Sequence, residues 1–489
     1  MFLSKSKYLA GLQCPKLLWH EYNRKDVIPG IDPLTRAVLD EGNRVGALAQ
    51  KLFPGGIKVA REYVPEKQAA KSLEALKLGK PLFEAGFVNQ QAYALADILV
   101  PVNDGVWDLI EVKSSTVVKD QNYHDVAFQK YTYQGAGLKI RKAYLMYINK
   151  EYVRRGEIEP AKFFLKQDIT EKADRLVPEI EAEIVGMQQV IGRSEMPDVR
   201  IGTHCTDPRD CPLKDLCWNF LPDEGHIFIL FRGGKHRYEL LERGILKLVD
   251  IPDDVELNAK QAIQVKSHRA DRAHVDKKAL GRFLKKFVYP LYFLDFETMA
   301  PAIPAYDLTS PYREVPFQYS VHVIEKEGAD PVHHSYLAPG DVDPRPEILQ
   351  RLKALLGESG SIIAYYADFE KRCLKNASDT YTDYRDWFKG LNGRFVDLLE
   401  PFQDFFYYHP AQAGSASLKN VLPAITGITY KGMEIADGRT ASAEYYRVTF
   451  DKKSDEKERQ RVRDALEKYC DLDTRGMVEI YLALKDQIN

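Results

Sequence analysis

Long apolar runs are missing from this chain of 489 residues. No stretch approaches the ~20 consecutive apolar residues that a membrane-spanning helix needs, so we expect no membrane span and no membrane partner. The N-terminal stretch MFLSKSKYLAGLQCPK also lacks the apolar centre of a secretory signal peptide. The sequence therefore predicts a cytoplasmic protein.

Cysteine is scarce and charge is balanced, with six cysteines and a formal net charge of −2. So few cysteines in a cytoplasmic chain argue against a disulfide framework and leave metal binding, redox chemistry or packing. A net charge near zero excludes a global basic field, so any contact with nucleic acid must use local patches. The apolar share of 45% is ordinary for a globular protein, and the length favours two or three domains.

Carboxylates and a lysine gather in ALADILVPVNDGVWDLIEVKSST, residues 94–116. The run 103–105 (Asn-Asp-Gly) between two apolar segments predicts a hairpin. Glu111 and Lys113 lie two apart and share a strand face, and we expect Asp97 beside them on the neighbouring strand. Two carboxylates can hold Mg²⁺, and the ammonium can orient a water or stabilise charge on a phosphate. An exposed strand with an ordinary ion pair is the alternative.

The flanking segments extend this pattern. A predicted strand at 81–87 carries Glu84, and a predicted helix at 125–138 carries Gln129 and Tyr133, which lie four apart on one face. A further strand is predicted at 142–148.

The ordered set E, D, ExK and QxxxY resembles the RecB-like PD-(D/E)XK nucleases. The resemblance implies that Glu84, Asp97 and Glu111 are metal-site carboxylates and that Lys113 is the catalytic lysine. It also implies that Gln129 and Tyr133 support them.

Three cysteines follow a predicted helix at 167–190, in THCTDPRDCPLKDLCW. Cys205, Cys211 and Cys217 lack the CxxC spacing of zinc ribbons, and Cys14 is the only other cysteine before residue 373. One remote N-terminal cysteine and three after the nuclease core resemble the iron–sulfur RecB-like nucleases of the AddB and CRISPR-associated types. The resemblance implies that these four cysteines hold a [4Fe–4S] cluster that joins the two ends of the domain. A zinc ion is the alternative.

Residues 221–286 predict a connector with helices at 238–249 and 258–265. Its last part, KSHRADRAHVDKKALGRFLKK, carries eight Lys or Arg residues against two Asp residues. This stretch is either a solvated helix face or a patch that contacts phosphates.

A second carboxylate set begins at LYFLDFET, where a predicted strand places Asp295 and Glu297 on one face. Further strands are predicted at 317–324 and 334–337. The segment EKYCDLDTRGM predicts a helix that carries Tyr469 and Asp473 four apart on one face.

Between them, SIIAYYADFEKRCL runs from a predicted strand into a helix with Asp368 and Glu370, and RFVDLL adds Asp397. The order DxE, an acid at a strand–helix junction, and YxxxD resembles the DEDD exonucleases of the RNase H-like, DnaQ-type superfamily. This chain departs from that pattern: Tyr366 stands where an Asn normally precedes the acid, and Glu370 stands in place of an Asp.

The second resemblance implies metal binding by Asp295, Glu297, Glu370 and Asp473, with Tyr469 orienting the attacking water. Asp397 stands where the superfamily often has a supporting Asp. Lys419, at the start of a predicted helix, is either a surface lysine or a phosphate contact, and Cys373 and Cys470 are predicted to pack in the core.

We therefore expect an α/β protein with a PD-(D/E)XK restriction-endonuclease-like domain at 1–220, a basic connector at 221–286 and an RNase H-like domain at 287–489. The expected function is a Mg²⁺- or Mn²⁺-dependent DNA exonuclease with two hydrolytic sites, the C-terminal one working 3′→5′. The alternatives are a nucleic-acid-binding protein with one active site, and an RNase. No particular protein partner is indicated.

Overall fold

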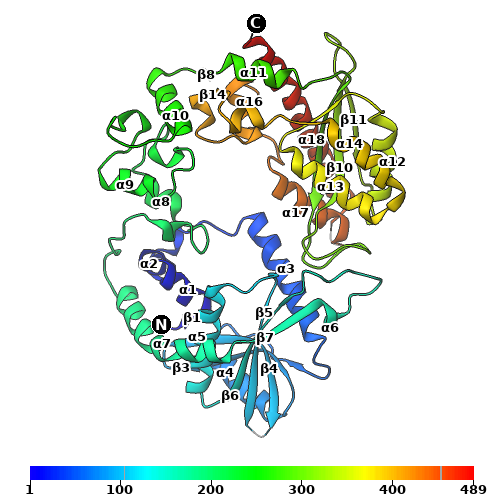
Figure 1. Ribbon diagram of the computed structural model, residues 1–489. Coiled ribbons are helices and arrows are strands. Elements are labelled where there is room, and N and C mark those ends of the chain that lie inside the picture. The colour runs from blue at the N-terminus through cyan, green and yellow to red at the C-terminus, as the bar shows by residue number, and fades with distance from the viewer. Residues whose placement is uncertain (104, 452–453, 489) are drawn as a thin grey trace. The chain divides into compact units, whose positions relative to one another are not determined.

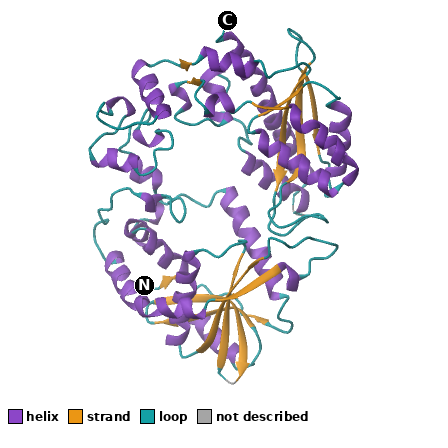
Figure 2. Ribbon diagram, viewed as in Figure 1, coloured by secondary structure: helices purple, strands orange, loops and turns teal. Residues whose placement is uncertain are grey.

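The computed structural model describes residues 1–103, 105–451 and 454–488. The chain divides into two units, Met1–Asn219 with Pro301–Tyr312, and Phe220–Ala300 with Arg313–Asn489. Both combine helices with β-sheets (Figure 2), so the α/β class is confirmed. Asp104, in the predicted hairpin turn, lies outside the described residues. No described helix is long and apolar enough to cross a membrane.

Figure 1 shows the helices and strands of the first unit, coloured by residue number. Its strands are β1 (Leu3–Ser4), β2 (Ile57–Lys58), β3 (Leu82–Asn89), β4 (Ala92–Asn103), β5 (Val106–Lys113), β6 (Lys139–Ile148) and β7 (Phe164–Asp168). Its helices are α1 (Lys5–Gln13), α2 (Pro15–Asn23), α3 (Pro33–Gln50), α4 (Pro65–Leu76), α5 (Asp120–Gly135), α6 (Pro160–Phe163), α7 (Thr170–Ile191) and α8 (Lys214–Trp218).

These strands form one mixed sheet in the order β2-β3-β4-β5-β6-β7, with β1 beside β4. The pairs β3–β4 and β4–β5 are antiparallel, whereas β5–β6 is parallel and is bridged by α5. The parallel crossover explains why a helix must lie between Lys113 and the strand that begins at Lys139.

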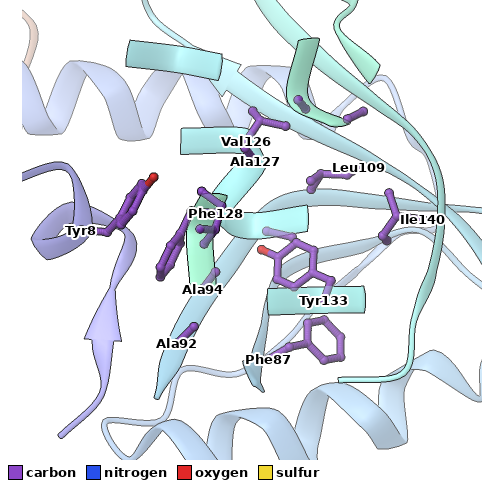
Figure 3. Close-up of a cluster of buried hydrophobic side chains, with 14 of the residues drawn as sticks. Tyr8, Phe87, Ala92, Ala94, Leu109, Val126, Ala127, Phe128, Tyr133 and Ile140 are labelled. Carbon is purple, nitrogen blue, oxygen red and sulfur yellow. The ribbon is translucent and has the colours of Figure 1, made fainter. Parts of the chain in front are cut away.

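Apolar residues cover both faces of this sheet. On one face Leu109 packs with residues of α5 and α7, and on the other Ile110 packs with residues of α3. Figure 3 shows the first cluster, in which Tyr8 of α1 stacks on Phe128 of α5 with ring centroids 4.6 Å apart. Because side chains alternate along a strand, Glu111 lies on the same face as Leu109 and points towards α5.

A segment from the second half of the chain completes the first unit. Residues 301–312 pack on it: the Ala302 amide donates to Glu41 at 2.6 Å, and Arg154 donates to the Pro304 carbonyl at 2.9 Å. The Tyr312 hydroxyl donates to the carbonyl of Ser114, next to Lys113. This segment was expected in the C-terminal domain, and its side-chain contacts place it in the first unit.

The second unit contains a five-stranded sheet and a two-stranded one. Its strands are β8 (His274–Val275), β9 (Leu291–Met299), β10 (Val315–Ile324), β11 (Val332–Leu337), β12 (Ser361–Ala364), β13 (Phe395–Asp397) and β14 (Tyr407–Tyr408). Its helices are α9 (His236–Glu242), α10 (Ala259–Ala270), α11 (Lys277–Leu284), α12 (Arg345–Leu355), α13 (Ala367–Thr380), α14 (Arg385–Leu391), α15 (Glu400–Gln403), α16 (Leu418–Thr426), α17 (Gly438–Phe450) and α18 (Glu456–Asp486).

The larger sheet has the order β11-β10-β9-β12-β13. The strand β10 is antiparallel to both of its neighbours, β11 and β9, whereas β12 and β13 run parallel to β9 and to each other. Phe296 and Leu294 face a core that includes α12 and α13. The alternate residues Asp295 and Glu297 therefore face the opposite side, where α18 packs on β9 and β10.

The helix α18 begins where the Asp455 side chain accepts the amide of Glu458 at 2.8 Å, an N-cap that satisfies a free donor. It is far longer than the predicted helix at 467–477, and its buried residues recur every three or four positions. Likewise, α5 begins at Asp120 and not at Asp125. The predicted helix at 238–249 is shorter, since α9 ends at Glu242.

The segment expected as a connector, 221–286, lies within the second unit. There β8 pairs with β14, and Gln264 of α10 donates to the Tyr408 hydroxyl at 3.2 Å. An Asn258–Gln261 capping box begins α10. The β8–β14 pairing and the Gln264–Tyr408 hydrogen bond therefore join this segment to residues that follow β13 in the chain.

Candidate functional sites

The first site lies where β5 meets α5 and α1. Lys113 Nζ donates to Glu111 Oε1 at 2.7 Å and to Asp125 Oδ2 at 2.5 Å. Lys5 Nζ donates to the same Glu111 oxygen at 2.7 Å and lies 3.4 Å from Asp125 Oδ1. Two ammonium groups thus share two carboxylates that are almost fully buried.

Gln129 and Tyr133 hold this group from α5. Gln129 Nε2 donates to Glu111 Oε2 at 2.8 Å and to Asp125 Oδ1 at 2.9 Å, and the Tyr133 hydroxyl donates to Gln129 Oε1 at 3.2 Å. Both side chains are fully buried. The predicted QxxxY face therefore contacts the predicted ExK face directly.

Asp97 lies where the two central strands separate. The β4–β5 pairing ends at Ile98 and Ile110, and beyond it Asp97 Oδ2 accepts the amide of Val112 at 2.7 Å. The strand β3 pairs with β4 in the same register before and after Glu84. Glu84 is therefore the residue of β3 that lies opposite Asp97. Glu84 has a φ of 58°, in the left-handed region that is strained for a residue with a Cβ.

Charge in this site is unevenly distributed. Burial and the nearby Glu111 raise the pKa of Asp97 to about 8. Burial opposes ionisation of Glu111 too, but Lys113 and Lys5 hold the pKa of Glu111 below its usual value. The site therefore holds one firmly ionised carboxylate beside one that keeps its proton, an arrangement that a divalent cation would convert to two ionised ligands.

The raised pKa of Asp97 predicts a pH-dependent stability in metal-free protein. The unfolded chain loses this proton near pH 4 and the folded one near pH 8. Between these values the unfolded state binds fewer protons, so the free energy of unfolding falls as pH rises, by up to ~1.4 kcal/mol per pH unit. Asp97→Asn, which can still accept the Val112 amide, should lessen this loss and raise the melting temperature at pH 8.

Thermal unfolding with chelator at pH 5 and pH 8 measures this effect. Glu84→Gln, a change at the opposite strand position, is the matched control and should keep the wild-type pH dependence. If Asp97→Asn loses as much stability between the two pH values as wild type does, the pKa of Asp97 is not raised.

The four cysteines named from the sequence line one small cavity of the first unit. Cys14 comes from the junction of α1 and α2, and Cys205, Cys211 and Cys217 from the loop and short helix after α7. Burial raises the pKa of the Cys211 and Cys217 thiols, and the other cysteines raise it further.

This donor set fits a cofactor that binds thiolates. Gln13 Nε2 fixes the loop by donating to the carbonyls of His204 and Arg209, at 2.9 and 2.7 Å. Four thiols around one cavity suit either an iron–sulfur cluster or zinc.

The second site gathers four carboxylates from three elements: β9 supplies the half-buried Asp295 and the buried Glu297, α13 supplies the buried Glu370, and α18 supplies the buried Asp473. Burial and proximity to Asp473 raise the pKa of Asp295, and burial raises the pKa of Asp473 to about 6. Burial also raises the pKa of Glu297 and Glu370.

Glu370 occupies this site and Asp368 does not. Glu370 is 2% exposed and its Oε2 has no hydrogen-bond partner among the described residues. The Asp368 side chain is 78% exposed. An unpartnered buried carboxylate oxygen beside three other acids fits a place for a divalent cation, because so many carboxylates cannot ionise together without one.

Two tyrosines contact the second site. The Tyr430 hydroxyl donates to Asp473 Oδ1, and Tyr469 lies close enough to Asp473 to oppose the rise in its pKa. Lys419 Nζ lies 5.3 Å from the Tyr469 ring centroid, and its positive charge offsets a small part of the rise in the pKa of Glu297 that burial causes. Asp397 has a structural role, since its Oδ1 accepts hydrogen bonds from the backbone amides of Tyr366 and Leu399 at 2.9 and 3.0 Å.

Several contributors to the two sites were missed from sequence. Lys5 and Asp125 in the first site and Tyr430 in the second had no assigned role. Cys470, expected only to pack, donates its thiol to Asp295 Oδ2 at 3.8 Å. Of these four residues, only Asp125 could have been found from sequence, because it precedes Gln129 by four residues and so lies on the same face of α5.

Comparison with known protein families places part of the second unit in a described domain family. Residues 292–417 match a domain family described as "Domain of unknown function (DUF2779)". The match includes Asp295, Glu297 and Glu370 and leaves residues 1–291 and 418–489 outside it. No curated protein matches the chain.

Proposed function

We propose that this chain is a divalent-metal-dependent nuclease with two phosphodiester-hydrolysing sites, a RecB-like PD-(D/E)XK site in the first unit and a DEDD-type 3′→5′ exonuclease site in the second. The observation that carries the proposal is the convergence, inside each unit, of buried carboxylates from separate elements beside a side chain suited to handle a proton. The mixed sheet with its β5–α5–β6 crossover supports the first fold. Three antiparallel strands followed by two parallel ones support an RNase H-like second fold.

In the first site, Asp97 and Glu111 would hold Mg²⁺ or Mn²⁺. A bound divalent ion supplies a nucleophilic water at neutral pH and charge stabilisation at the phosphate. Lys113, held by Glu111 and Asp125, is positioned to donate to the attacking water or to a phosphate oxygen. Lys5 adds a second positive charge, and Gln129 orients the carboxylates.

In the second site, Asp295, Glu297, Glu370 and Asp473 would hold the metal. Tyr469 is assigned to orient the attacking water. Lys419, whose charge interacts with Asp295, Glu297 and Asp473, would contact a phosphate, so we favour this role over that of an ordinary surface lysine. The products would be 5′-phosphorylated nucleotides or short oligonucleotides.

A substrate panel tests the proposal. Single- and double-stranded DNA and RNA, labelled at either end, would be incubated with Mg²⁺ or Mn²⁺ and four proteins: wild type, Lys113→Ala, Asp295→Ala and the double variant. Each single variant should keep one metal-dependent activity, and the double variant should have none. Absence of cleavage by wild type on every substrate would favour a binding protein, and cleavage of RNA alone would favour an RNase.

Lys113→Ala has a specific expected outcome. It should remove cleavage by the first site, by on the order of 10²–10⁴-fold for a lost proton-handling or charge-stabilising group. The fold should persist, because Lys5 still neutralises Glu111. Cleavage by the Lys113→Ala, Asp295→Ala double variant at the wild-type rate would rule out the lysine's role. Lys130→Ala, which removes a buried lysine paired with Asp174 outside the site, is the matched control.

A further inference from the structure

Two histidines and an aspartate that the proposed nuclease does not use lie together in the second unit. His322 of β10 and His333 of β11 are register partners with ring centroids 4.5 Å apart. Asp471 Oδ1, from α18, lies 3.3 Å from His333 Nδ1 and 3.7 Å from His322 Nε2. All three potential ligand atoms are within 4.8 Å of one another.

Each histidine forms a hydrogen bond to a hydroxyl through one ring nitrogen and turns the other ring nitrogen towards Asp471. His333 Nε2 lies 2.8 Å from Ser320 Oγ, and His322 Nδ1 lies 2.8 Å from Thr474 Oγ1. The two hydroxyls are 2.6 Å apart, and Thr474 donates to a carbonyl of the preceding turn. The protons can be assigned so that each has an acceptor: His333 donates to Ser320, His322 donates to Thr474, and the Ser320 hydroxyl donates to the Thr474 hydroxyl. Both facing nitrogens then carry lone pairs, which is how bound imidazoles are held in metal sites.

We propose that His322, His333 and Asp471 form a binding site for a zinc-class divalent ion, separate from the carboxylate site. Zn–N bonds of 2.0–2.1 Å in a tetrahedron separate ligand atoms by about 3.3 Å, close to the 3.3 and 3.7 Å between Asp471 Oδ1 and the two imidazole nitrogens. Imidazole nitrogens favour zinc and its transition-metal neighbours, whereas Mg²⁺ prefers oxygen. The two sites would therefore select different ions.

The surroundings of this His–His–Asp site suit an exchangeable ion. The side chains of His333 and Asp471 are 33% and 40% exposed, so an ion can reach them, while His322 is 7% exposed and anchors the site.

A bound ion would connect an edge strand to the helix that carries Tyr469 and Asp473. The strand β11 lies at the sheet edge, and its residues Val332–Ser335 are exposed. Coordination by His333 and Asp471 joins this strand to α18. The site thus has a positioning role, and it requires neither nuclease activity nor the RNase H-like assignment.

Zinc content in the full-length protein tests the site. Protein treated with chelator, equilibrated with Zn²⁺ and freed of excess would be analysed for zinc per chain. All samples would carry Asp295→Asn to weaken the carboxylate site. His333→Ala should hold one zinc fewer than its parent. The matched control is His334→Ala, which alters the neighbouring β11 histidine, the register partner of Val321.

The cysteine cavity can also take zinc, but it contributes equally to each sample and cancels in the difference. Ser320→Ala should weaken zinc binding at this site by about 10–100-fold, the range for a lost hydrogen-bond partner of a ligand. Equal zinc content in His333→Ala, His334→Ala and the parent would overturn the proposal. So would an equal loss in both histidine variants, or Mg²⁺ competing with Zn²⁺ at similar concentration.

Discussion

An Asp295→Asn protein is expected to lose 3′→5′ cleavage by the second unit almost completely. Asp295 lies at the centre of the site: its charge interacts with Asp473 and Glu370, and its Oδ2 accepts the Cys470 thiol. Removing its charge weakens the site for the metal that activates water and stabilises the phosphate. The loss should exceed the 10²–10⁴-fold typical of one proton-handling group, the range expected for Tyr469→Phe.

The measurement uses 5′-labelled substrates in a Lys113→Ala background, so that the first site is silent. A matched pair on α13 sharpens it. Glu370→Gln should be severely impaired, because the buried Oε2 then offers no charge to a cation. Asp368→Asn should retain activity, because that side chain is exposed. Full activity of Glu370→Gln beside an inactive Asp368→Asn would show that the wrong acid was assigned. No 3′→5′ activity on any substrate would mean that this unit binds ends without cutting them.

The second large effect is expected at the cysteine cavity. Anaerobically purified wild type should be brown and contain about four irons per chain. Cys14→Ser should lose most of this iron and strongly destabilise the first unit, because a cofactor held by these cysteines would close a loop that runs from residue 14 to residue 205. By the chain-entropy account, a cross-link over so long a loop stabilises the fold by about 5 kcal/mol.

Iron analysis together with thermal unfolding checks this result. Cys373→Ala is the matched control: it removes a buried thiol of the second unit, which is outside the cavity, and should leave the iron content unchanged. One zinc and no iron in wild type would refute the cluster and support the zinc alternative. Equal iron in wild type and Cys14→Ser would exclude Cys14 as a ligand.

The sequence by itself determined which side chains share a face within one element. Glu111 with Lys113 follows from the two-residue period of a strand, and Gln129 with Tyr133 and Tyr469 with Asp473 follow from the helical repeat. These relations depend on backbone geometry alone, so they hold wherever the element packs. The α/β class follows from the same periodicities, although helix ends such as those of α5 and α18 do not, because caps and packing set them.

Only the tertiary structure decided which distant elements meet. Lys5 reaches Glu111 from α1, Tyr430 reaches Asp473 from a loop, and residues 301–312 pack on the first unit. The His322–His333–Asp471 group likewise needs both the β10–β11 register and the position of α18. Such contacts depend on how whole elements pack around a core. No local periodicity records them, since residues far apart in the chain become neighbours only when the apolar faces that carry them are buried together.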